Sequence, residues 1–258
     1  MLLTIDSGNT NIVFAVFDND DTIRGKWRVS TRSSRTADEL AIWLMQLLQI
    51  EDLDRKEIDG TIIATVVPDT LFALKTLCRK YFKSEPLIVG EPEVSLNIKN
   101  NTERPEEVGA DRIVNAMAAR DRYKGPLIIV DFGTATTFDV VDAGGDYYGG
   151  VIAPGINLSL EALHMAAAKL PRVAIRKPET VIGKHTVSAM QSGVFWGYIS
   201  MIEGMVDRIK AELDVDMHVI ATGGLAPLFA ESTTAIQDVD SDLTLHGLLS
   251  IFKLNREA

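Results

Sequence analysis

Residues 2–17 read LLTIDSGNTNIVFAVF, and residues 127–141 read LIIVDFGTATTFDVV. Each stretch begins with an apolar run, passes through an aspartate-x-glycine turn and resumes as a β-branched and aromatic run, which predicts two strands joined by a tight turn. A shift of 125 positions aligns Leu2 with Leu127, Asp6 with Asp131, Gly8 with Gly133 and Val16 with Val141. An offset near half the chain favours an internal duplication over the chance resemblance of two ordinary hairpins.

The segments after each hairpin alternate between strand and helix patterns. In the first half, Thr36-x-x-Glu39 is a capping box before a helix, residues 61–67 and 86–90 are strands, and a helix lies between them over 69–82. A further helix follows Gly109, and a long helix runs from about Ser188 to Glu212. This alternation predicts an α/β fold of two halves, 1–123 and 124–258.

The composition excludes several classes of function. The 258 residues include 26 basic and 36 acidic side chains, so the net charge is −10, and no dense Lys/Arg cluster suits a nucleic-acid partner. No apolar run reaches the roughly 18 residues of a membrane helix, and no leader-like segment opens the chain. With a single cysteine, Cys78, and four scattered histidines, neither disulfides nor a zinc site are expected. We therefore expect a cytoplasmic protein.

Three predicted strands end in glycine-bearing turns, IDSGNTN, VDFGTATT and VIATGG. Successive N–H groups in such turns form an anion-binding concavity, although each turn alone could be a plain hairpin. The carboxylates of Asp6 and Asp131 would repel a phosphate unless a cation lay between carboxylate and phosphate. Mg²⁺ is the usual cation in such a place. Together the turns predict a nucleotide site that contains a metal ion.

The chemistry at this site is narrowed by the motifs that the sequence lacks. The P-loop, the dinucleotide-binding Gly-x-Gly-x-x-Gly after a strand, and the Gly-x-Ser-x-Gly elbow are all missing, which leaves phosphoryl transfer. Asp111 is a candidate base for an acceptor hydroxyl, and Arg112 a candidate partner for a substrate carboxylate. An ordinary helix N-terminus, where acidic residues are favoured, is the alternative.

The long predicted helix carries Gly193, Gly197 and Gly204. Glycine costs a soluble helix about 1 kcal/mol per site relative to alanine. Its presence predicts close backbone approach to another helix, either inside the subunit or across a dimer.

Six motifs in a fixed order resemble one known family. They are DSGNTN (6–11), EVGADRIVNA (107–116), DFGTATTFDVV (131–141), GGVIAPG (149–155), LPRV (170–173) and GKHTVSAMQSGVFWGY (183–198). The set resembles type III pantothenate kinase, of the acetate kinase/sugar kinase/Hsp70/actin superfamily, from Leu2 to LTLHGLL at 243–249. The resemblance implies a duplicated ribonuclease-H-like, actin-like ATPase fold with two mixed sheets, flanking helices and an ATP cleft. It also implies ATP-dependent phosphorylation of pantothenate to 4'-phosphopantothenate, the first step of coenzyme A biosynthesis.

The resemblance further implies a role for each matching position. The first phosphate loop, around ATP and Mg²⁺, would be Asp6, Ser7, Gly8, Asn9, Thr10, Asn11, Ile12 and Val13. Further ATP contacts would be Thr134, Gly223 and Gly224. Pantothenate would meet Gly109, Ala110, Asp111, Arg112 and, across a homodimer interface, Thr186. Asp111 would accept the hydroxyl proton, and Asp131 would hold K⁺ or NH₄⁺.

One position departs from the family pattern. Members often have Lys-Tyr-x-Asn-Pro before the Glu-Val-Gly-Ala-Asp-Arg run, with the tyrosine touching pantothenate. Here Thr102 stands at the tyrosine position and Arg104 replaces the asparagine. This difference bears on the affinity or pose of pantothenate, while the catalytic positions are intact.

Two other functions remain open at this point. One is a superfamily kinase that uses another hydroxyl acceptor. The other is a non-catalytic nucleotide-binding regulatory protein, since the family has also been called Bvg accessory factor. Retention of Asp6, Asp111 and Asp131 argues against a dead enzyme.

Overall fold

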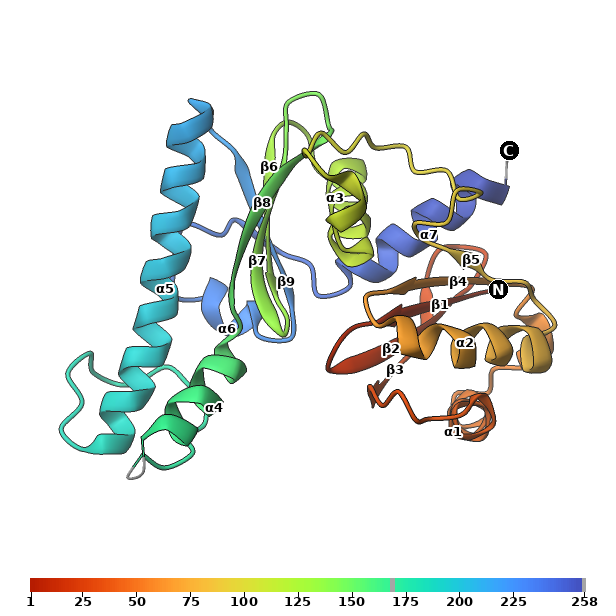
Figure 1. The fold of residues 1–258 in the computed structure, drawn as a ribbon, viewed down its shortest axis with the longest axis horizontal. Helices are drawn as coiled ribbons and strands as arrows, with labels where there is room; N and C mark the ends of the chain where they lie inside the picture. Colours follow the sequence, from red (N-terminus) through yellow and green to blue (C-terminus); the bar gives the residue numbers. More distant parts are fainter. Residues whose placement is uncertain (168–169, 257–258) are drawn as a thin grey trace. The chain divides into compact units, whose positions relative to one another are not determined.

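The computed structural model describes residues 1–167 and 170–256, drawn in Figure 1. The chain forms two compact units, called unit 1 and unit 2 below. Unit 1 contains Met1–Lys99, Glu103–Ala118 and the residues from Leu243 onward, and unit 2 contains Asn100–Thr102 and Ala119–Asp242. The expected halves, 1–123 and 124–258, differ from these units mainly at the C-terminal helix, which packs on the first sheet.

Unit 1 is built on a five-stranded sheet in the order β3-β2-β1-β4-β5. Its strands are β1 (Leu2–Ser7), β2 (Asn11–Phe17), β3 (Ile23–Ser30), β4 (Gly60–Thr65) and β5 (Leu87–Ile88). Strands β1, β2 and β3 are antiparallel neighbours, whereas β4 runs parallel to both β1 and β5. The sheet is therefore mixed, and β1, β3 and β4 have their carboxyl ends on the same side of the sheet, called the sheet edge below.

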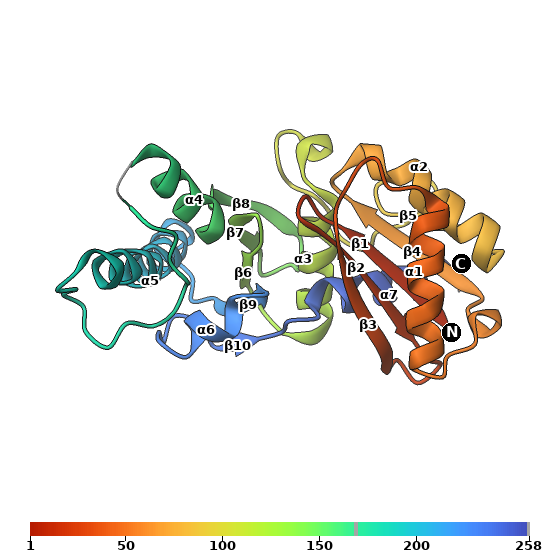
Figure 2. The same cartoon turned by 90° about the horizontal axis from the view of Figure 1, so that it is seen from below.

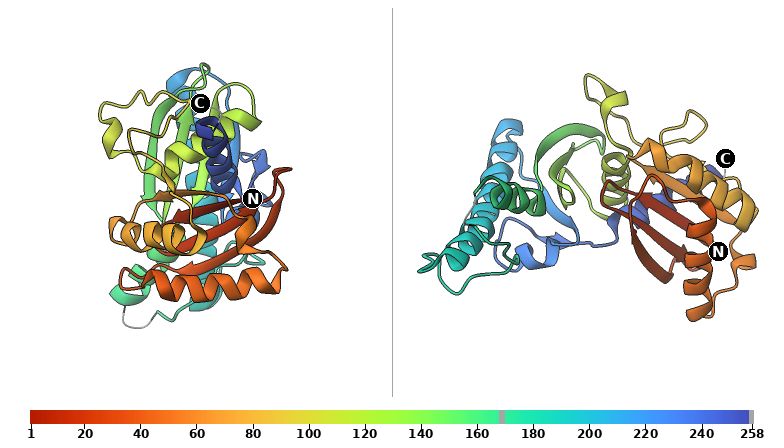
Figure 3. Two further views of the ribbon diagram at one scale, coloured as in Figure 1. Left: turned by 90° about the vertical axis from the view of Figure 1, so that its right-hand side faces the viewer. Right: turned by 60° about the horizontal axis from the view of Figure 1, so that its bottom comes forward.

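Helices cover both faces of this sheet, as Figures 1 and 3 show. They are α1 (Ala37–Ile50), α2 (Pro68–Leu77), α3 (Ala110–Arg122) and α7 (Leu243–Arg256), with short helical turns at Arg55–Glu57, Cys78–Phe82 and Pro105–Glu107. Side chains alternate along a strand, so Leu3 and Ile5 pack with α1 and α2, while Leu2 packs with α3 and α7. Both layers of the core are apolar.

Unit 2 repeats this plan with a sheet in the order β10-β9-β6-β7-β8. Its strands are β6 (Leu127–Phe132), β7 (Ala135–Val141), β8 (Tyr147–Pro154), β9 (His218–Gly223) and β10 (Asp238–Val239). Its helices are α4 (Ile156–Ala166), α5 (Thr186–Leu213) and α6 (Ala226–Ala230). Figure 2 shows α4 beside α5, and Phe195, Ile199 and Ile202 of α5 pack against the sheet.

The predicted duplication is present in the two sheets. Strands β1 and β6 share one sequence of buried and half-buried positions, and so do β2 and β7. However, three residues separate β1 from β2 and only two separate β6 from β7. The offset therefore changes by one at the turn, so that Phe17 corresponds to Val141, and the expected match of Val16 to Val141 is wrong.

Most predicted helices are confirmed with small changes at their ends. Thr36 caps α1 by accepting from the Glu39 amide at 3.2 Å, and the Glu39 carboxylate accepts from the Thr36 amide at 2.7 Å. The helix expected over 69–82 ends at Leu77 and continues as a π-helical turn over Cys78–Phe82. Within the described residues, no helix is both long and apolar enough to cross a membrane.

Candidate functional site

Asp6 lies at the carboxyl end of β1, just before the turn that joins β1 to β2. Its side chain is half-buried, and Asn9 and Thr10 in the turn are exposed. The Gly8 amide donates to the Asn11 carbonyl at 3.0 Å, which closes the turn. The turn therefore presents backbone and polar groups beside one carboxylate.

Two residues of the 6–13 run, Ser7 and Ile12, have buried side chains. The Ser7 hydroxyl is buried and lies 2.9 Å from the Thr70 hydroxyl. Ile12 is also buried, in the core beneath α1. The side chains of these two residues therefore face the interior of unit 1 rather than a ligand.

Asp111 lies in the first turn of α3, close to the edge of the sheet where β1 and β4 end. A Cβ atom on Gly109 would come 2.6 Å from the Asp111 Oδ1 atom and 3.4 Å from a methyl carbon of Val66. Val66 follows β4, and its amide donates to the Ser7 carbonyl at 3.1 Å. The fold of unit 1 thus brings Asp111 to the sheet edge that carries the turn after Asp6, and Gly109 leaves room for the carboxylate.

The environment of Asp111 changes its acidity. Burial raises the pKa of this carboxyl above its ordinary value of 3.8, and the Arg112 backbone amide and charge offset part of the rise. The Arg112 amide donates to Oδ1 at 2.8 Å, so the carboxylate is oriented as well as desolvated. A carboxylate with a raised pKa is a stronger base at neutral pH.

Asp131 occupies the equivalent place in unit 2, at the end of β6. Phe132 pairs with Gly223 of β9, and Gly223 has a φ of +90°. A Cβ atom there would come 2.7 Å from the Phe132 carbonyl oxygen and 2.8 Å from Asp131 Oδ1, so only glycine fits. The second and third glycine turns of the sequence therefore meet at Asp131.

The other predicted ATP contacts of unit 2 surround the same turn. Gly133, Thr134 and Gly224 are exposed. Gly155, just before α4, packs so tightly against the Thr134 carbonyl that a Cβ atom would collide with it. The path of the Thr134 main chain is thus fixed by a neighbouring backbone.

Asp6 and Asp131 are the two carboxylates that the sequence predicted to hold cations. Asp131 Oδ1 and the Phe132 carbonyl oxygen both approach Gly223, so a carboxylate oxygen and a carbonyl oxygen lie near the same turn. Among residues 1–167 and 170–256, no three His, Cys, Asp or Glu side chains cluster as a metal site. Asp6 supplies one half-buried carboxylate, and Mg²⁺ is commonly held in proteins by one or two carboxylates together with waters and substrate phosphates.

Two predicted pantothenate contacts, Thr102 and Thr186, belong to unit 2, whereas the Gly109–Arg112 run belongs to unit 1. The Thr102 amide and hydroxyl donate to Asn100 Oδ1 at 3.1 and 2.7 Å, and the Asn101 amide donates to the Tyr147 carbonyl at 2.9 Å. Thr186 is exposed at the start of α5. These contacts fix Thr102 against β8.

A groove of about 720 Å³ lies between α4 and α5. Its lining is Ser159, Leu163, Leu170, Thr186, Ala189, Met190, Gly193, Val194, Gly197 and Tyr198. Cβ atoms on Gly193 and Gly197 would meet no described atom within 4 Å, so no other helix among the described residues approaches them closely. Of the two explanations for these glycines, packing inside the subunit is wrong.

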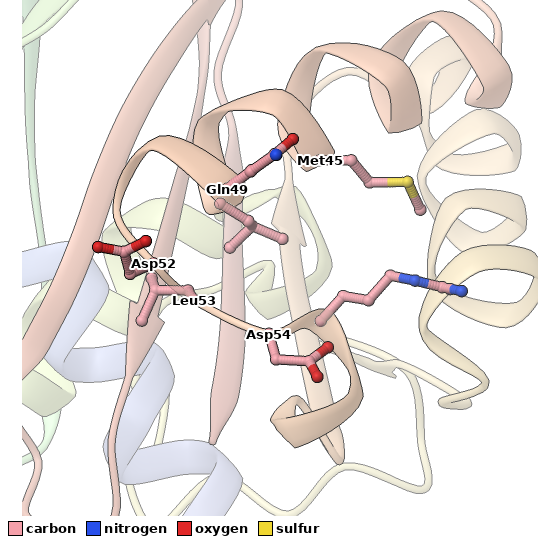
Figure 4. Close-up of a pocket in the computed structure, with 7 residues that line it drawn as sticks. Met45, Gln49, Asp52, Leu53 and Asp54 are labelled. Atoms are coloured by element: carbon pink, nitrogen blue, oxygen red, sulfur yellow. The ribbon is translucent and has the colours of Figure 1, made fainter.

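Figure 4 shows a second hollow, of about 440 Å³, at the end of α1. The Asp54 carboxylate there caps the Lys56 amide at 2.9 Å, and the Arg55 guanidinium donates to the Tyr81 carbonyl at 2.7 Å. The Met1 ammonium group donates to the nearby Glu57 carbonyl at 2.7 Å, which places this segment at the start of β1. The hollow is therefore at the opposite end of β1 from Asp6 and is not part of the candidate site.

Sequence reasoning missed two residues that shape the turn after Asp6. Val66 fixes the end of β4 next to Ser7, and Thr31 donates to two carbonyls of the turn. Neither lies in a glycine-bearing motif. Sequence reasoning had no signal for Thr31, because the strand that precedes it was not predicted either.

Comparisons with known proteins agree on one family. The model of the type III pantothenate kinase family matches residues 2–208. A type III pantothenate kinase from Paramagnetospirillum magneticum is 68% identical over 255 residues, covering 99% of this chain and 98% of that protein. One from Rhodospirillum rubrum is 63% identical over 256 residues, covering 99% of both.

Solved structures share the fold at much lower identity. A conserved Campylobacter jejuni protein assigned to the Baf family has a TM-score of 0.62 at 18% identity, covering 99% of this chain and 100% of that one. The activator of 2-hydroxyisocaproyl-CoA dehydratase from Clostridium difficile, solved with bound ADPNP, has a TM-score of 0.56 at 12% identity, covering 99% and 96%. The duplicated actin-like ATPase fold expected from the sequence is confirmed.

Proposed function

Since this chain belongs to the type III pantothenate kinase family, we propose that it transfers the γ-phosphoryl group of ATP to the terminal hydroxyl of pantothenate with Asp111 as the general base. The kinase activity, the first step of coenzyme A biosynthesis, follows from the family. The role of Asp111 rests on one observation, a desolvated and oriented carboxylate at the sheet edge where β1 ends.

The proposed reaction is an in-line transfer. The Asp111 carboxylate accepts the proton of the pantothenate hydroxyl while that oxygen bonds to the γ-phosphorus atom. The bond between the γ-phosphorus and its bridging oxygen breaks, and ADP leaves with the electron pair. Positioned bases of this kind contribute about 10²–10⁴ in rate.

The remaining residues position the two substrates. The Gly109–Arg112 run binds pantothenate, with the Arg112 guanidinium on its carboxylate. The turn after Asp6 and the turn around Thr134, Gly223 and Gly224 bind ATP through main-chain groups. Asp6 would hold Mg²⁺ and Asp131 would hold K⁺ or NH₄⁺, and these cations supply positive charge beside the phosphates when bound.

The protein is further proposed to act as a homodimer through the groove between α4 and α5. The exposed apolar side chains around it support this assembly, because large exposed apolar patches mark interaction sites. Leu163 in the lining is exposed, as are Leu158 and Met165 elsewhere on α4 and Val181 and Ile182 shortly before α5. In such a dimer Thr186 would reach the pantothenate of the partner subunit. A cytoplasmic location is proposed with it, in line with the single buried thiol of Cys78.

Measurement of ADP formation tests the base. Purified protein is given ATP and Mg²⁺, with and without pantothenate, and compared with Asp111→Asn. We expect pantothenate-dependent ADP formation by the wild type and a loss of about 10²–10⁴ in turnover for the variant, with ATP affinity by calorimetry nearly unchanged. Wild-type turnover by the variant would overturn the assignment of Asp111.

The same assay in K⁺, NH₄⁺ or Na⁺ buffer tests Asp131. We expect pantothenate-dependent turnover in K⁺ or NH₄⁺ and little in Na⁺. Equal rates in all three buffers would contradict the monovalent cation site. ADP formation with a different hydroxyl acceptor, or none with any acceptor, would instead point to the two alternative functions raised by the sequence.

A further inference from the structure

We propose that Thr31 is a positioning residue for ATP, because it orients the peptide between Gly8 and Asn9 so that the Asn9 N–H faces a phosphate oxygen. Thr31 lies outside every motif that the resemblance assigns to a ligand. The proposal deepens the proposed function and rests on ATP binding at the turn after Asp6.

Thr31, which directly follows β3, is hydrogen-bonded to the turn after Asp6. Asn11 pairs with Ser30, the last residue of β3, so Thr31 follows directly beside the turn. The Thr31 amide donates to the Thr10 carbonyl at 2.9 Å, and its hydroxyl donates to the Gly8 carbonyl at 2.6 Å. Two carbonyl groups of the turn are thus directed toward one half-buried threonine.

The orientation of the Gly8 carbonyl determines where the next N–H points. The C=O and N–H of a trans peptide lie in one plane and point in opposite directions, and no cis peptide is present in the described chain. Because the Gly8 carbonyl points to Thr31, the Asn9 N–H points away from it. Among residues 1–167 and 170–256, this N–H donates to no backbone carbonyl outside the helices and strands.

A ligand anion is the natural acceptor for this N–H. Asn9 is exposed, and the Gly8 amide is already bonded to the Asn11 carbonyl, so Asn9 contributes the donor at the tip of the turn. Without the Thr31 hydroxyl, the peptide can rotate and the donor is no longer held toward the phosphate. Fixed main-chain donors bind anions more tightly than mobile ones because their ordering cost is already met.

Matched threonine variants test this role. Thr31→Val removes the hydroxyl but keeps the β-branched shape, and Thr31→Ser keeps the hydroxyl. We expect Thr31→Val to raise the KM for ATP about threefold to tenfold, the effect of one neutral hydrogen bond, with the KM for pantothenate unchanged. Thr31→Ser should restore the wild-type KM for ATP.

The control is Thr4→Val, which removes a similar bond from a buried threonine hydroxyl to the Ala15 carbonyl, at 3.3 Å, in the same sheet. It should lower the melting temperature without changing either KM. An unchanged KM for ATP in Thr31→Val, or an equal rise in Thr4→Val, would overturn the proposal.

A measurement on the wild type keeps the test independent of folding in the variants. In an ¹H–¹⁵N spectrum, the Asn9 amide should move to lower field on addition of Mg²⁺ and a non-hydrolysable ATP analogue. An unmoved Asn9 signal at saturation would overturn the role of Thr31. If the wild type binds the analogue in this way but forms no ADP with pantothenate, the proposed function fails while this inference stands.

Discussion

At the scale of single residues, Asp111 illustrates the conflict between chemistry and stability. Its pKa is raised in the folded protein, mainly by burial, so the ionised form that serves as a base is the less stable one in the fold. A group with a raised pKa stabilises the protein below its unfolded pKa, and this contribution is lost as pH rises through the folded value. At neutral pH the wild-type carboxylate therefore destabilises unit 1.

Asp111→Asn should accordingly raise the melting temperature at pH 7.5 while it removes turnover. The gain should shrink as the pH falls and should be lost below about 4, where the wild-type carboxyl is protonated in both the folded and the unfolded state. Scanning calorimetry at several pH values checks this. The variant Asp121→Asn, at an exposed position of the same helix α3, is the control and should show no such pH-dependent gain. Equal melting temperatures for wild type and Asp111→Asn at pH 7.5 would contradict the prediction.

Contacts between individual residues were the features of the structure that the sequence predicted least well. The aspartate-x-glycine pattern predicted where Asp6 and Asp131 lie, because a carboxylate at a strand end depends on local sequence alone. The convergence of Asp131 Oδ1 and the Phe132 carbonyl on Gly223 depends on the pairing of β6 with β9, which are about 90 residues apart in the chain. Local patterns carry no information on such a pairing.

At the scale of elements, periodicity predicted those elements that local sequence determines. Helix α5 was expected over Ser188–Glu212 and occupies Thr186–Leu213. By contrast, β3, α4 and α7 were not predicted. Strand β3 lies at the edge of the sheet, where charged side chains disfavour pairing with other chains, and its Arg24, Lys26 and Arg28 are exposed. These three charged residues interrupt the apolar pattern by which a strand is predicted. Helix α7 is stabilised by packing on an apolar surface of unit 1, and this contact cannot be read from its local sequence.

The capping box of α1 gives an element-scale prediction. Thr36→Ala removes the side-chain acceptor of the Glu39 amide and the reciprocal geometry at the helix start. We expect a loss of about 0.5–2 kcal/mol in the free energy of unfolding, measured by urea denaturation. Thr36→Ser keeps the oxygen atom and should lose much less. A Thr36→Ala midpoint equal to the wild type would show that the box does not stabilise α1.

At the scale of the whole molecule, the open glycines of α5 test the assembly. A side chain at Gly197 meets no described atom of its own chain, so Gly197→Arg should fold as a monomer but clash with a partner seated on the groove. Light scattering should give twice the chain mass for the wild type and about half of that value for the variant. Asp207→Arg, on exposed α5 surface outside the groove lining, should leave the mass unchanged. A monomeric wild type would contradict the proposed dimer.

The grouping of α7 with unit 1 has a consequence for how the protein is made. A ribosome completes Ala119–Asp242 before it reaches Leu243, so unit 2 can fold while unit 1 still lacks a helix. At about 5–20 residues per second, synthesis of Ala119–Asp242 takes roughly 6–25 seconds, and during this time the apolar face of β1 and β4 lacks its α7 cover. That interval is when the newborn chain is most exposed to aggregation and to capture by chaperones, and it ends when Leu245, Leu248 and Ile251 emerge and close the core.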